Sequence, residues 1–577
     1  MRKLAEICEQ VASTSKKLEK AAIVAAYFKS SQIDQAATSA VFLSGRPFPL
    51  WEETTLQVGG SSLWRLVGEL SGKSQADLTA AYKRYGDLGS VAAEVLPRTR
   101  VSTDLSVLDV QDRFRAIAAA RGVAGKTILL RDLLSRAAPL EAKYIMKIMT
   151  GDLRIGLKES LVEEAIAKAY GAAAAEVQRA NMLLGDIGET LRLAALGRLA
   201  GARMRLFHPL GFMLASPADS AAAALSYFEN AFVEDKYDGI RAQVHVSGDN
   251  VKIFSRTRDE ITESFPELAD ALCGFSQDAI LDGEIVAWSY PAAEADPGRA
   301  LPFSALQARL GRKKVSHDLI RRVPVAYLAF DVLYAAGELL LEHPLKQRAS
   351  ILDGLLAAQK KSLKHQGHEG SRRLIRPHPQ SRLAFESPQQ AAVTQITRAP
   401  VFRASSPEEL DRLFDAAQAR GNEGLMIKDP ESPYTPGRRG KSWLKLKREL
   451  ATLDAVVTAV EYGHGKRISV LSDYTFAVRD GDQLVNIGKA YSGLTDVEIA
   501  EMTQWFLAHT IEDQGLRLMV EPKIVVEVAF NNMMRSDRHN SGYALRFPRI
   551  VRLRPDKLPE DADTIERARE IYEKQAK

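Results

Sequence analysis

The chain has 577 residues, 46% of them hydrophobic and 26% charged, a composition typical of a soluble globular protein with roughly three or four domains. The formal net charge of +5 fits a polyanionic partner but does not identify one. Only two cysteines occur, Cys8 and Cys273, which excludes a four-cysteine zinc site and a disulfide framework and favours a reducing cytosol. We expect no signal peptide and, because no run of about 18 apolar residues occurs, no membrane span.

Residues 1–205 are rich in Ala, Leu, Lys and Glu and contain few β-branched runs, which predicts an all-helical domain. One segment shows the pattern clearly. Ser160 and Glu163 have the spacing of a capping box, apolar residues follow at helical intervals, and Gly171 is placed to end the helix. We therefore predict a helix over residues 160–170.

Residues 206–448 alternate short apolar strands with helices, which predicts a mixed α+β domain. A helix is expected after Ser406, because a proline follows it and Glu409 lies three residues on, and Gly421 is placed to end this helix. We interpret the basic, turn-rich insert at residues 358–382 as a mobile surface loop rather than a DNA-binding device. The expected strands lie in VEDKYDGIRAQVHV, AILDGEIVAW and VAYLAFDVLY.

Residues 449–577 contain short strands at fairly regular spacing, one clear helix near Asp496 to His509 and a charged tail that we expect to be helical. This pattern is typical of a small β-barrel such as an OB-fold. The predicted fold class is therefore multidomain, with an all-α N-terminal domain, an α+β domain and a C-terminal β-barrel.

The segment around Lys236 carries the pattern Lys-x-Asp-Gly between two strand-like runs. Four residues with one wildcard recur by chance, and a charged β-hairpin that turns at Asp238-Gly239 explains them equally well. The interpretation changes because further charged segments follow in order. They are Phe254-Ser255-Arg256, Leu281-Asp282-Gly283-Glu284, Tyr327-Leu328-Ala329-Phe330, Glu423-Gly424-Leu425-Met426-Ile427-Lys428, Trp443-Leu444-Lys445-Leu446-Lys447 and a basic stretch from Arg546 to Lys557.

Buried strands seldom carry ionisable side chains, because burying an unpaired charge costs several kcal/mol. Four apolar strands here carry or adjoin charged side chains, and convergence on an anion and a metal ion would explain them. A single such strand could be an edge strand with its polar face in water. The charged side chains are Lys236, Glu284, Lys428, Lys445 and Lys447.

The residue types suggest particular chemistry. A free lysine, with a pKa of about 10.4, is neutral in only about one molecule in 10³ at physiological pH. We expect Lys445 and Lys447 to favour the neutral, nucleophilic amine of Lys236. Glu284 and Glu423 offer hard oxygen ligands for Mg²⁺. The side chains expected to contact phosphate, ribose or adenine are Arg241, Arg256, Arg439 and Phe330.

With these segments in this order, the sequence resembles the ATP-dependent DNA ligases, specifically the three-domain archaeal and eukaryotic-like form, from a bacterial or archaeal source. The resemblance covers nearly the whole chain. It implies a helical DNA-binding domain at residues 1–205, an adenylation (nucleotidyltransferase) domain at 206–448 and an OB-fold domain at 449–577. The stretch Gly151 to Leu157 also resembles the most recognisable segment of the helical domain.

The resemblance also implies a role for each matching side chain. Lys236 resembles the lysine that becomes adenylated. Glu234 resembles the residue that reads the adenine amino group, and Phe330 the aromatic ring on which adenine stacks. The remaining roles are ribose, phosphate or DNA-end contacts for Arg241 and Arg256, metal or ribose contacts for Glu284 and Glu423, phosphate contacts for Lys428, Arg439, Lys445 and Lys447, pyrophosphate orientation for Arg552, Arg554, Asp556 and Lys557, and minor-groove contacts beside a nick for Phe303 and Phe547.

The implied activity seals 5′-phosphate/3′-hydroxyl nicks in duplex DNA through lysyl-AMP and DNA-adenylate intermediates. ATP and Mg²⁺ are the expected cofactors, with Mn²⁺ able to substitute, and nicked double-stranded DNA is the expected partner. We expect a cytoplasmic, nucleoid-associated monomer. No glutamine-plus-paired-aromatics peptide stands at either end, so a sliding-clamp partner is not expected.

Three other functions are weighed against this one. RNA ligases and mRNA capping enzymes share Lys-x-Asp-Gly chemistry, but the long helical N-terminal region suits a protein that wraps a duplex. An NAD-dependent ligase needs a cysteine zinc module, which two cysteines cannot build. A catalytically silent DNA-binding scaffold would have lost its nucleophile or metal carboxylates, whereas Lys236, Glu284, Glu423 and Lys445 are all present.

Overall fold

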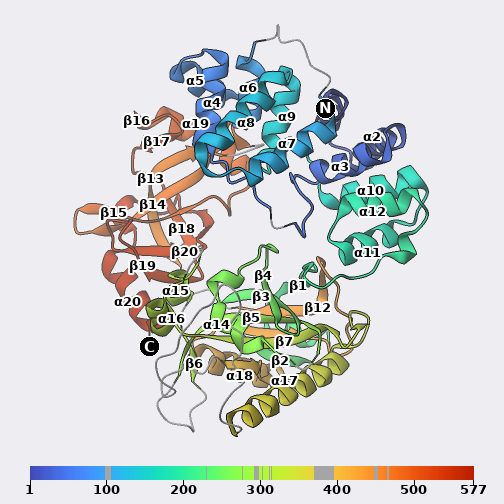
Figure 1. Ribbon diagram of the computed structural model, residues 1–577. Coiled ribbons are helices and arrows are strands. Elements are labelled where there is room, and N and C mark those ends of the chain that lie inside the picture. Colours follow the sequence, from blue (N-terminus) through green and yellow to red (C-terminus); the bar gives the residue numbers. More distant parts are fainter. Residues whose placement is uncertain are drawn as a thin grey trace. The chain divides into compact units, whose positions relative to one another are not determined.

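The computed structural model divides the chain into two compact units (Figure 1). The first comprises Met1–Lys20, Leu56–Leu157 and Arg448–Lys577, and the second comprises Ala21–Thr55 and Lys158–Lys447. The structure describes all residues except 53, 98–104, 229, 276, 291–297, 302, 311, 313–314, 369–394, 448–451, 464–466 and 577.

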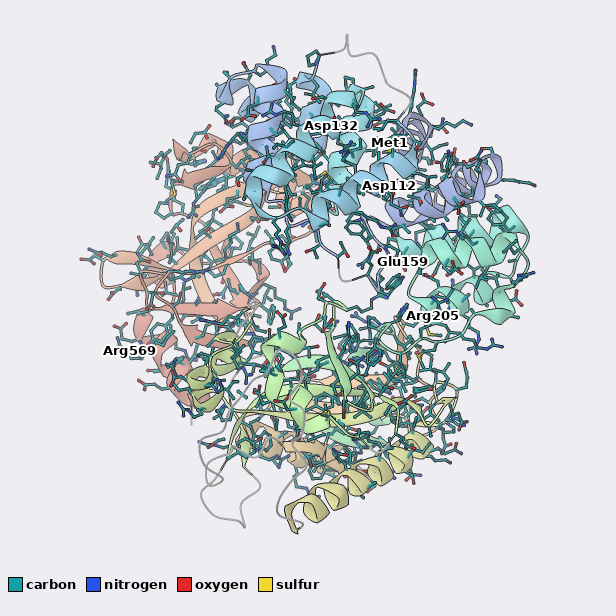
Figure 2. All side chains as sticks on the ribbon, in the orientation of Figure 1. Met1, Asp112, Asp132, Glu159, Arg205 and Arg569 are labelled. Carbon is teal, nitrogen blue, oxygen red and sulfur yellow. The ribbon has the colours of Figure 1, made fainter. Side chains whose placement is uncertain are left out.

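Every regular element among the described residues of 1–205 is a helix, which confirms the predicted all-helical region. The helix predicted over 160–170 begins one residue earlier, at Glu159 (labelled in Figure 2), and ends before Gly171. The predicted capping box is wrong, because Lys158 is the N-cap residue and no side chain caps this end. The helices are α1 (Arg2–Ser13), α2 (Lys17–Ser30), α3 (Ile33–Leu43), α4 (Gly60–Ser71), α5 (Gln75–Tyr85), α6 (Leu88–Val95), α7 (Val107–Ala119), α8 (Gly122–Arg136), α9 (Pro139–Met149), α10 (Glu159–Tyr170), α11 (Ala174–Leu184), α12 (Ile187–Ala195) and the 3₁₀ helix η1 (Leu199–Gly201).

Two mixed sheets form the core of the central region. The first has the strand order β1-β12-β11-β2-β10, and the second has the order β4-β3-β5-β7-β8, with β6 beside β5 and β9 beside β7. The strands are β1 (Leu214–Ala218), β2 (Phe232–Lys236), β3 (Ile240–Ser247), β4 (Asn250–Ser255), β5 (Ala279–Ser289), β6 (Arg299–Ala300), β7 (Val325–Ala335), β8 (Glu338–Leu339), β9 (Gln395–Arg398), β10 (Val401–Phe402), β11 (Gly424–Lys428) and β12 (Arg439–Leu446).

Helices cover the outer faces of both sheets, and the inner faces share a third cluster of buried side chains. One outer core packs α14 and α17 on the second sheet, and the other packs α13 and α18 on the first. The shared cluster includes Phe330 from β7 and Trp443 from β12, so it joins the two sheets. The helical elements here are α13 (Ala221–Leu225), η2 (Thr262–Ser264), α14 (Pro266–Leu272), α15 (Phe303–Gln307), α16 (His317–Arg322), α17 (Leu345–His368) and α18 (Pro407–Ala419).

Two local predictions for the central region have different outcomes. The helix expected after Ser406 is confirmed, because its hydroxyl accepts a hydrogen bond from the Glu409 N–H at 3.2 Å and α18 begins at the following proline. The basic insert is predicted as a surface loop, yet α17 continues through residues 358–368. For that part the prediction is wrong, because a helical pattern of Leu and Ala runs directly into the basic residues. Residues 369–382 of the insert lie outside the described residues.

The C-terminal region is strand-rich, as predicted. Its larger sheet has the order β15-β14-β13-β17-β16, and β13 also pairs with β18, which pairs with β21. One strand with three partners must bend strongly, as strands of small barrels do. The elements are β13 (Leu453–Tyr462), β14 (Leu471–Asp480), β15 (Gln483–Ala490), α19 (Asp496–Ala508), β16 (Thr510–Asp513), β17 (Arg517–Val520), β18 (Val525–Ala529), β19 (Asn532–Arg535), β20 (Tyr543–Arg546), β21 (Arg549–Leu553), η4 (Pro559–Asp561) and α20 (Ile565–Ala576).

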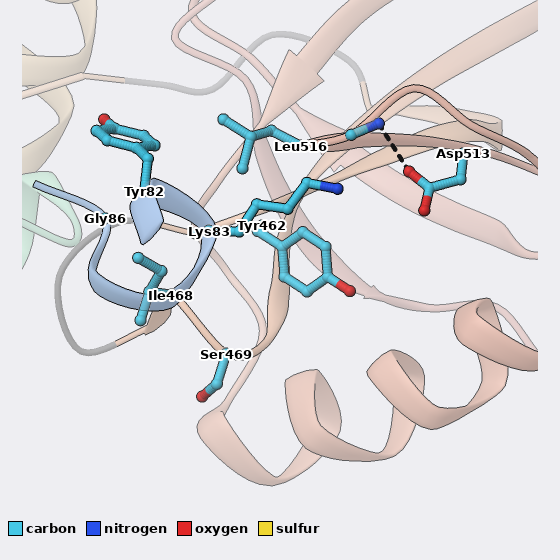
Figure 3. A pocket seen from close by; sticks show the side chains of 10 residues that line it. Tyr82, Lys83, Gly86, Tyr462, Ile468, Ser469, Asp513 and Leu516 are labelled. Atoms are coloured by element: carbon cyan, nitrogen blue, oxygen red, sulfur yellow. Dashed lines mark hydrogen bonds between the residues drawn. The ribbon is translucent and has the colours of Figure 1, made fainter. Parts of the chain in front are cut away.

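A cavity of about 250 Å³ lies in the first unit (Figure 3). Tyr82 and Lys83 of α5 line it together with residues of the C-terminal region, among them Tyr462 and Asp513. The Gly515 N–H donates a hydrogen bond to the Asp513 carboxylate at 2.7 Å and so fixes one wall. Within the described part of the chain, no helix combines the length and apolar character that crossing a membrane requires.

Candidate active site

The Lys-x-Asp-Gly segment connects the two central sheets. Strand β2 ends at Lys236 and β3 begins at Ile240, but β2 belongs to the first sheet and β3 to the second. The segment is therefore not the turn of a β-hairpin. A Cβ atom at Gly239 would lie 2.3 Å from the carbonyl oxygen of Ile285 in β5, so only glycine lets the chain cross so close to that strand.

The strand register gathers the predicted side chains on one face of the first sheet. Met426 of β11 lies opposite Glu234 of β2 and also opposite Lys445 of β12. Because side chains alternate along a strand, positions two residues away share this face. These positions are Lys236, Lys428 and Trp443, and the face is the one that meets the second sheet.

Glu423 connects two of the lysines. Its carboxylate accepts a hydrogen bond from Lys236 Nζ and forms an ion pair with Lys447. Burial opposes ionisation, but Lys236 and Lys447 together hold the pKa of Glu423 below its usual value. The candidate nucleophile is therefore held in place by a carboxylate that stays negatively charged.

A cluster of cations surrounds Lys445. Burial lowers the pKa of Lys445, and repulsion from Lys236, Arg439 and Arg256 lowers it further. Three of these side chains come from the first sheet, and Arg256 comes from the turn that follows β4 of the second sheet. Such a cluster suits a polyphosphate, whose negative charge would relieve the mutual repulsion.

Glu234 has one oxygen engaged and one without a hydrogen bond. Lys428 Nζ donates to Oε2 at 2.6 Å, and both side chains are almost fully buried. Burial lowers the pKa of Lys428, and the Glu234 carboxylate partly offsets that effect. Among the described residues, no donor makes a hydrogen bond to Glu234 Oε1, although this atom is buried, and its ion-pair partner Arg398 Nη1 lies 3.8 Å away. A buried acceptor of this kind fits a donor supplied by a ligand.

Aromatic rings line the same face. The rings of Phe330 and Trp443 meet edge to face, with centroids 6.0 Å apart. Lys428 Nζ lies 4.3 Å from each ring centroid, and the Arg241 guanidinium lies 5.4 Å from each. A flat heterocycle that binds beside Glu234 would therefore meet an aromatic surface that already accepts planar or cationic groups.

Arg241 is held by protein groups on the second sheet. Its Nε and Nη2 donate to the Asp282 carboxylate at 3.1 and 2.7 Å, and its Nη1 donates to the carbonyl oxygen of Met213 at 2.6 Å. The Tyr434 hydroxyl donates to Asp282 at 2.7 Å and accepts from the Met213 N–H at 3.0 Å. Burial alone would lower the pKa of Arg241, but Asp282 raises it above its usual value.

Glu284 lies directly opposite Arg241, where β3 pairs with β5. Burial raises the pKa of Glu284 to about 8, Lys236 and Arg241 act against this shift, and the nearby charges of Asp282 and Glu423 add to it. A divalent cation placed between Glu284 and Glu423 would remove this cost, which fits the predicted Mg²⁺ site. Among the described residues no group of three or more acidic, His or Cys side chains forms a metal site, so water and phosphate would supply the other ligands.

Several structural residues of the site carry no signal in the sequence. Asp282 belongs to the segment Leu281-Asp282-Gly283-Glu284, but in the sequence only its position in an apolar strand suggests that its carboxylate has a cationic partner. Tyr434, which binds it, lies in a loop without any pattern. Asp235, beside the nucleophile, points to the opposite face and accepts hydrogen bonds from Arg420 at 2.7 and 2.8 Å and from Asn422 at 2.8 Å.

The predicted minor-groove aromatics lie in different surroundings. Phe303 is half-buried and packs against the core of the second sheet. Phe547 is 65% exposed with a φ of +52°, and Arg546 stacks on its ring at 5.1 Å. Of these two aromatic side chains, only Phe547 is mostly exposed. The predicted pyrophosphate residues belong to the other compact unit and form their own charge cluster: Arg552, Arg554, Asp556 and Lys557.

A buried histidine attaches the segment before β1 to the second sheet. His245 Nδ1 accepts a hydrogen bond from the Phe207 N–H at 3.0 Å, and its Nε2 lies 2.8 Å from Gln243 Oε1. The same Gln243 oxygen accepts from the Leu210 N–H at 2.8 Å. Burial lowers the pKa of His245 to about 3, so the ring is neutral, with its proton on Nε2.

Comparisons with known proteins agree with these observations. Three family models match: the DNA ligase N terminus over residues 1–167, the ATP dependent DNA ligase domain over 212–447 and the ATP dependent DNA ligase C terminal region over 467–557. A "Probable DNA ligase" of Koribacter versatilis is 60% identical over 100% of this chain and 97% of its own length. A "DNA ligase" of Methanothrix thermoacetophila is 35% identical over 99% of this chain and 98% of its own.

A likeness to a solved structure supports the fold. The structure named "Pmar-Lig_Pre." covers 96% of this chain and 99% of its own, with a TM-score of 0.60 and 17% identity. At this identity the likeness concerns the fold alone.

Proposed function

Because the chain belongs to the ATP-dependent DNA ligase family, we propose that Lys236 is the side chain that this ligase adenylates. The protein is an enzyme that uses ATP to join DNA. The observation that carries it is the shared sheet face on which Lys236, the Glu234 oxygen that accepts no hydrogen bond and the cations around Lys445 meet.

The reaction begins with transfer of AMP to the enzyme. The Lys236 amine gives up a proton and its lone pair forms a bond to the α-phosphorus of ATP. The bond from that phosphorus to the oxygen bridging the α- and β-phosphates breaks, and pyrophosphate leaves with the electron pair. Lys445, Arg256 and Arg439 are positioned by their mutual proximity to bind the phosphates as this charge moves.

The second and third steps use DNA. The 5′-phosphate of a nick attacks the lysyl-AMP phosphorus and releases Lys236, and the 3′-hydroxyl then attacks the activated 5′-phosphate and releases AMP. The cations that bind the phosphates of ATP also suit the 5′-phosphate. Phe547, which is exposed and next to Arg546, is an aromatic side chain available for a DNA contact in its own domain.

Glu234 supports adenine as the base. Adenine presents an amino group at position 6, which can donate a hydrogen bond to Oε1, an atom that accepts none from the described residues, whereas guanine presents a carbonyl oxygen there. With guanine, two acceptors would face each other in a buried site, and a site built for a donor rejects such an analogue strongly. This favours a DNA ligase that uses ATP over a capping enzyme that uses GTP.

We assign Mg²⁺, with Mn²⁺ as a substitute, to Glu284 and Glu423. When bound, the ion would neutralise phosphate charge and polarise the phosphoryl group. The raised pKa of Glu284 means that the metal-free site favours its protonated form at neutral pH, so cation binding would displace a proton there.

Incubation with ATP labelled at the α-phosphate tests the proposal. We expect an acid-labile protein–AMP bond in the wild type and in Lys346→Ala, a matched exposed lysine of the same region, but none in Lys236→Ala. GTP should label the protein at least about 100-fold less efficiently. Label on Lys236→Ala, or equal labelling by GTP, would contradict the assignment. Nicked duplex with a 5′-phosphate should then be sealed, and nicked duplex without it should not.

A further inference from the structure

Asp454 lies at the centre of the charge cluster in the C-terminal region. It is the second residue of β13, and its carboxylate accepts hydrogen bonds from Arg554 Nη1, at 2.9 Å to each oxygen, and from Lys557 Nζ at 2.6 Å. The side chain is only 12% exposed. Two cations that belong to one sequence motif are therefore held by one carboxylate about 100 residues earlier in the chain.

Arg554 has little capacity left for a ligand. Its Nε and Nη2 donate to the Asp556 carboxylate at 2.9 and 2.7 Å, while Nη1 faces Asp454. The hydrogen bond from Arg554 lowers the pKa of Asp556 to about 2, so this carboxylate remains ionised. The guanidinium of Arg554 therefore bridges the two carboxylates of Asp454 and Asp556.

Lys557 has the opposite character. Among the described residues its ammonium group has one hydrogen-bond acceptor, Asp454, and the side chain is 30% exposed. An ammonium carries three N–H donors, so two are left for an anion. The contact with Asp454 fixes where these two donors point.

The backbone holds Asp454 rigidly. Its N–H donates to the Asp563 carboxylate at 2.8 Å, and its carbonyl oxygen accepts from the Asp563 N–H at 2.8 Å. Across the sheet it lies opposite Glu527, which in turn pairs with Arg552 at 2.7 Å. The carboxylate therefore sits on a fixed strand rather than on a loop that could follow the cations.

We propose that Asp454 is a positioning residue that presents Lys557 to the departing pyrophosphate during adenylation of Lys236. This rests on the proposed adenylation of Lys236 and on the pyrophosphate role that the family resemblance implies for these basic residues. When the bond between the α-phosphorus and the bridging oxygen breaks, negative charge grows on pyrophosphate. A cation fixed in advance stabilises that charge without reorganising. Asp454 also offsets the repulsion between Lys557 and Arg554 that would otherwise push them apart.

The test compares Asp454→Asn with a matched control, Asp473→Asn. Asp473 lies on the neighbouring strand β14 and pairs with a lysine, Lys489, at 3.4 Å, but it does not contact the motif. For Asp454→Asn we expect lysyl-AMP formation from ATP to slow about 10- to 100-fold, while sealing of a nick that already carries a 5′-AMP changes less than about twofold. The control variant should match the wild type in both assays.

The variant Lys557→Ala distinguishes the leaving-group role of Lys557 from the positioning role of Asp454. If Lys557→Ala leaves lysyl-AMP formation unchanged, the leaving-group role of the motif fails. If Lys557→Ala slows this step but Asp454→Asn does not, only the role of Asp454 is overturned. If Asp454 acts through Lys557, the double variant that combines Asp454→Asn and Lys557→Ala should form lysyl-AMP no more slowly than the slower of the two single variants. Equal loss in both assays together with a lowered Tm would show a structural role instead and would overturn the inference.

Discussion

The buried histidine on β3 makes the stability of its surroundings depend on pH. His245 titrates near 3 in the folded protein, against an ordinary value of about 6.5. Because the folded-state pKa is depressed, the stability it contributes is complete above pH 6.5 and is lost as the pH falls toward 3. Between pH 7.5 and 5.0 the unfolded form gains a proton that the folded form does not, which costs about 2 kcal/mol at about 1.4 kcal/mol per pKa unit.

This pH dependence can be measured by hydrogen exchange at the backbone N–H groups that donate to His245 and Gln243. The N–H groups of Phe207 and Leu210 should lose protection by about 30-fold between pH 7.5 and 5.0, after correction for the intrinsic exchange rate. The comparison is His245→Asn, whose amide oxygen can still accept from Phe207 but does not titrate. We expect this variant to show no comparable loss. Protection in the wild type that is independent of pH, or the same loss in His245→Asn, would refute the reasoning.

Three further substitutions have expected outcomes. Gly424→Ala should lower the free energy of unfolding by at least about 2 kcal/mol, measured as a fall in Tm, because its φ is +145° and a Cβ would lie 2.3 Å from the Leu446 carbonyl oxygen. Arg348→Met should lower the free energy of unfolding by about 3–5 kcal/mol, measured in the same way, because it leaves the fully buried Asp331 carboxylate without its ion-pair partner at 2.8 Å. An unchanged Tm would contradict that ion pair. Phe547→Ala should raise the KM for nicked DNA about 10-fold without changing lysyl-AMP formation, and loss of both activities would speak against a DNA contact.

The strand registers place several of the predicted site residues on one sheet face, for a physical reason. Strand alternation puts Lys236 and Glu234 on one face, and the same rule applied to β11 and β12 adds Lys428 and Lys445. The sequence could not reveal that β2 and β3 belong to different sheets, because a hairpin and a crossing between sheets begin with the same turn residues. That distinction depends on pairing with β5 and β11, far along the chain.

The acidic partners of the cations were missed for a related reason. Asp282 and Asp454 are single carboxylates in apolar strands, and nothing local identifies the arginine or lysine that each will meet. Local rules also failed at Ser160, where the capping pattern is present but the helix begins a residue earlier. Contacts between distant segments decide these features, so they appear only when the fold is assembled.

The position of Asp454 has a consequence for how the enzyme is assembled. Asp454 and the Lys557 that it orients toward the leaving pyrophosphate are both encoded after residue 451, whereas every group proposed to hold adenine is encoded before residue 448. The carboxylate that orients Lys557 travels with it, on the first strand of the same region. Changes in the length of the connecting segment would therefore alter how often the two halves of the chemistry meet, while each half keeps its own internal geometry. Nucleotide choice and the positioning of Lys557 can thus vary independently in this chain.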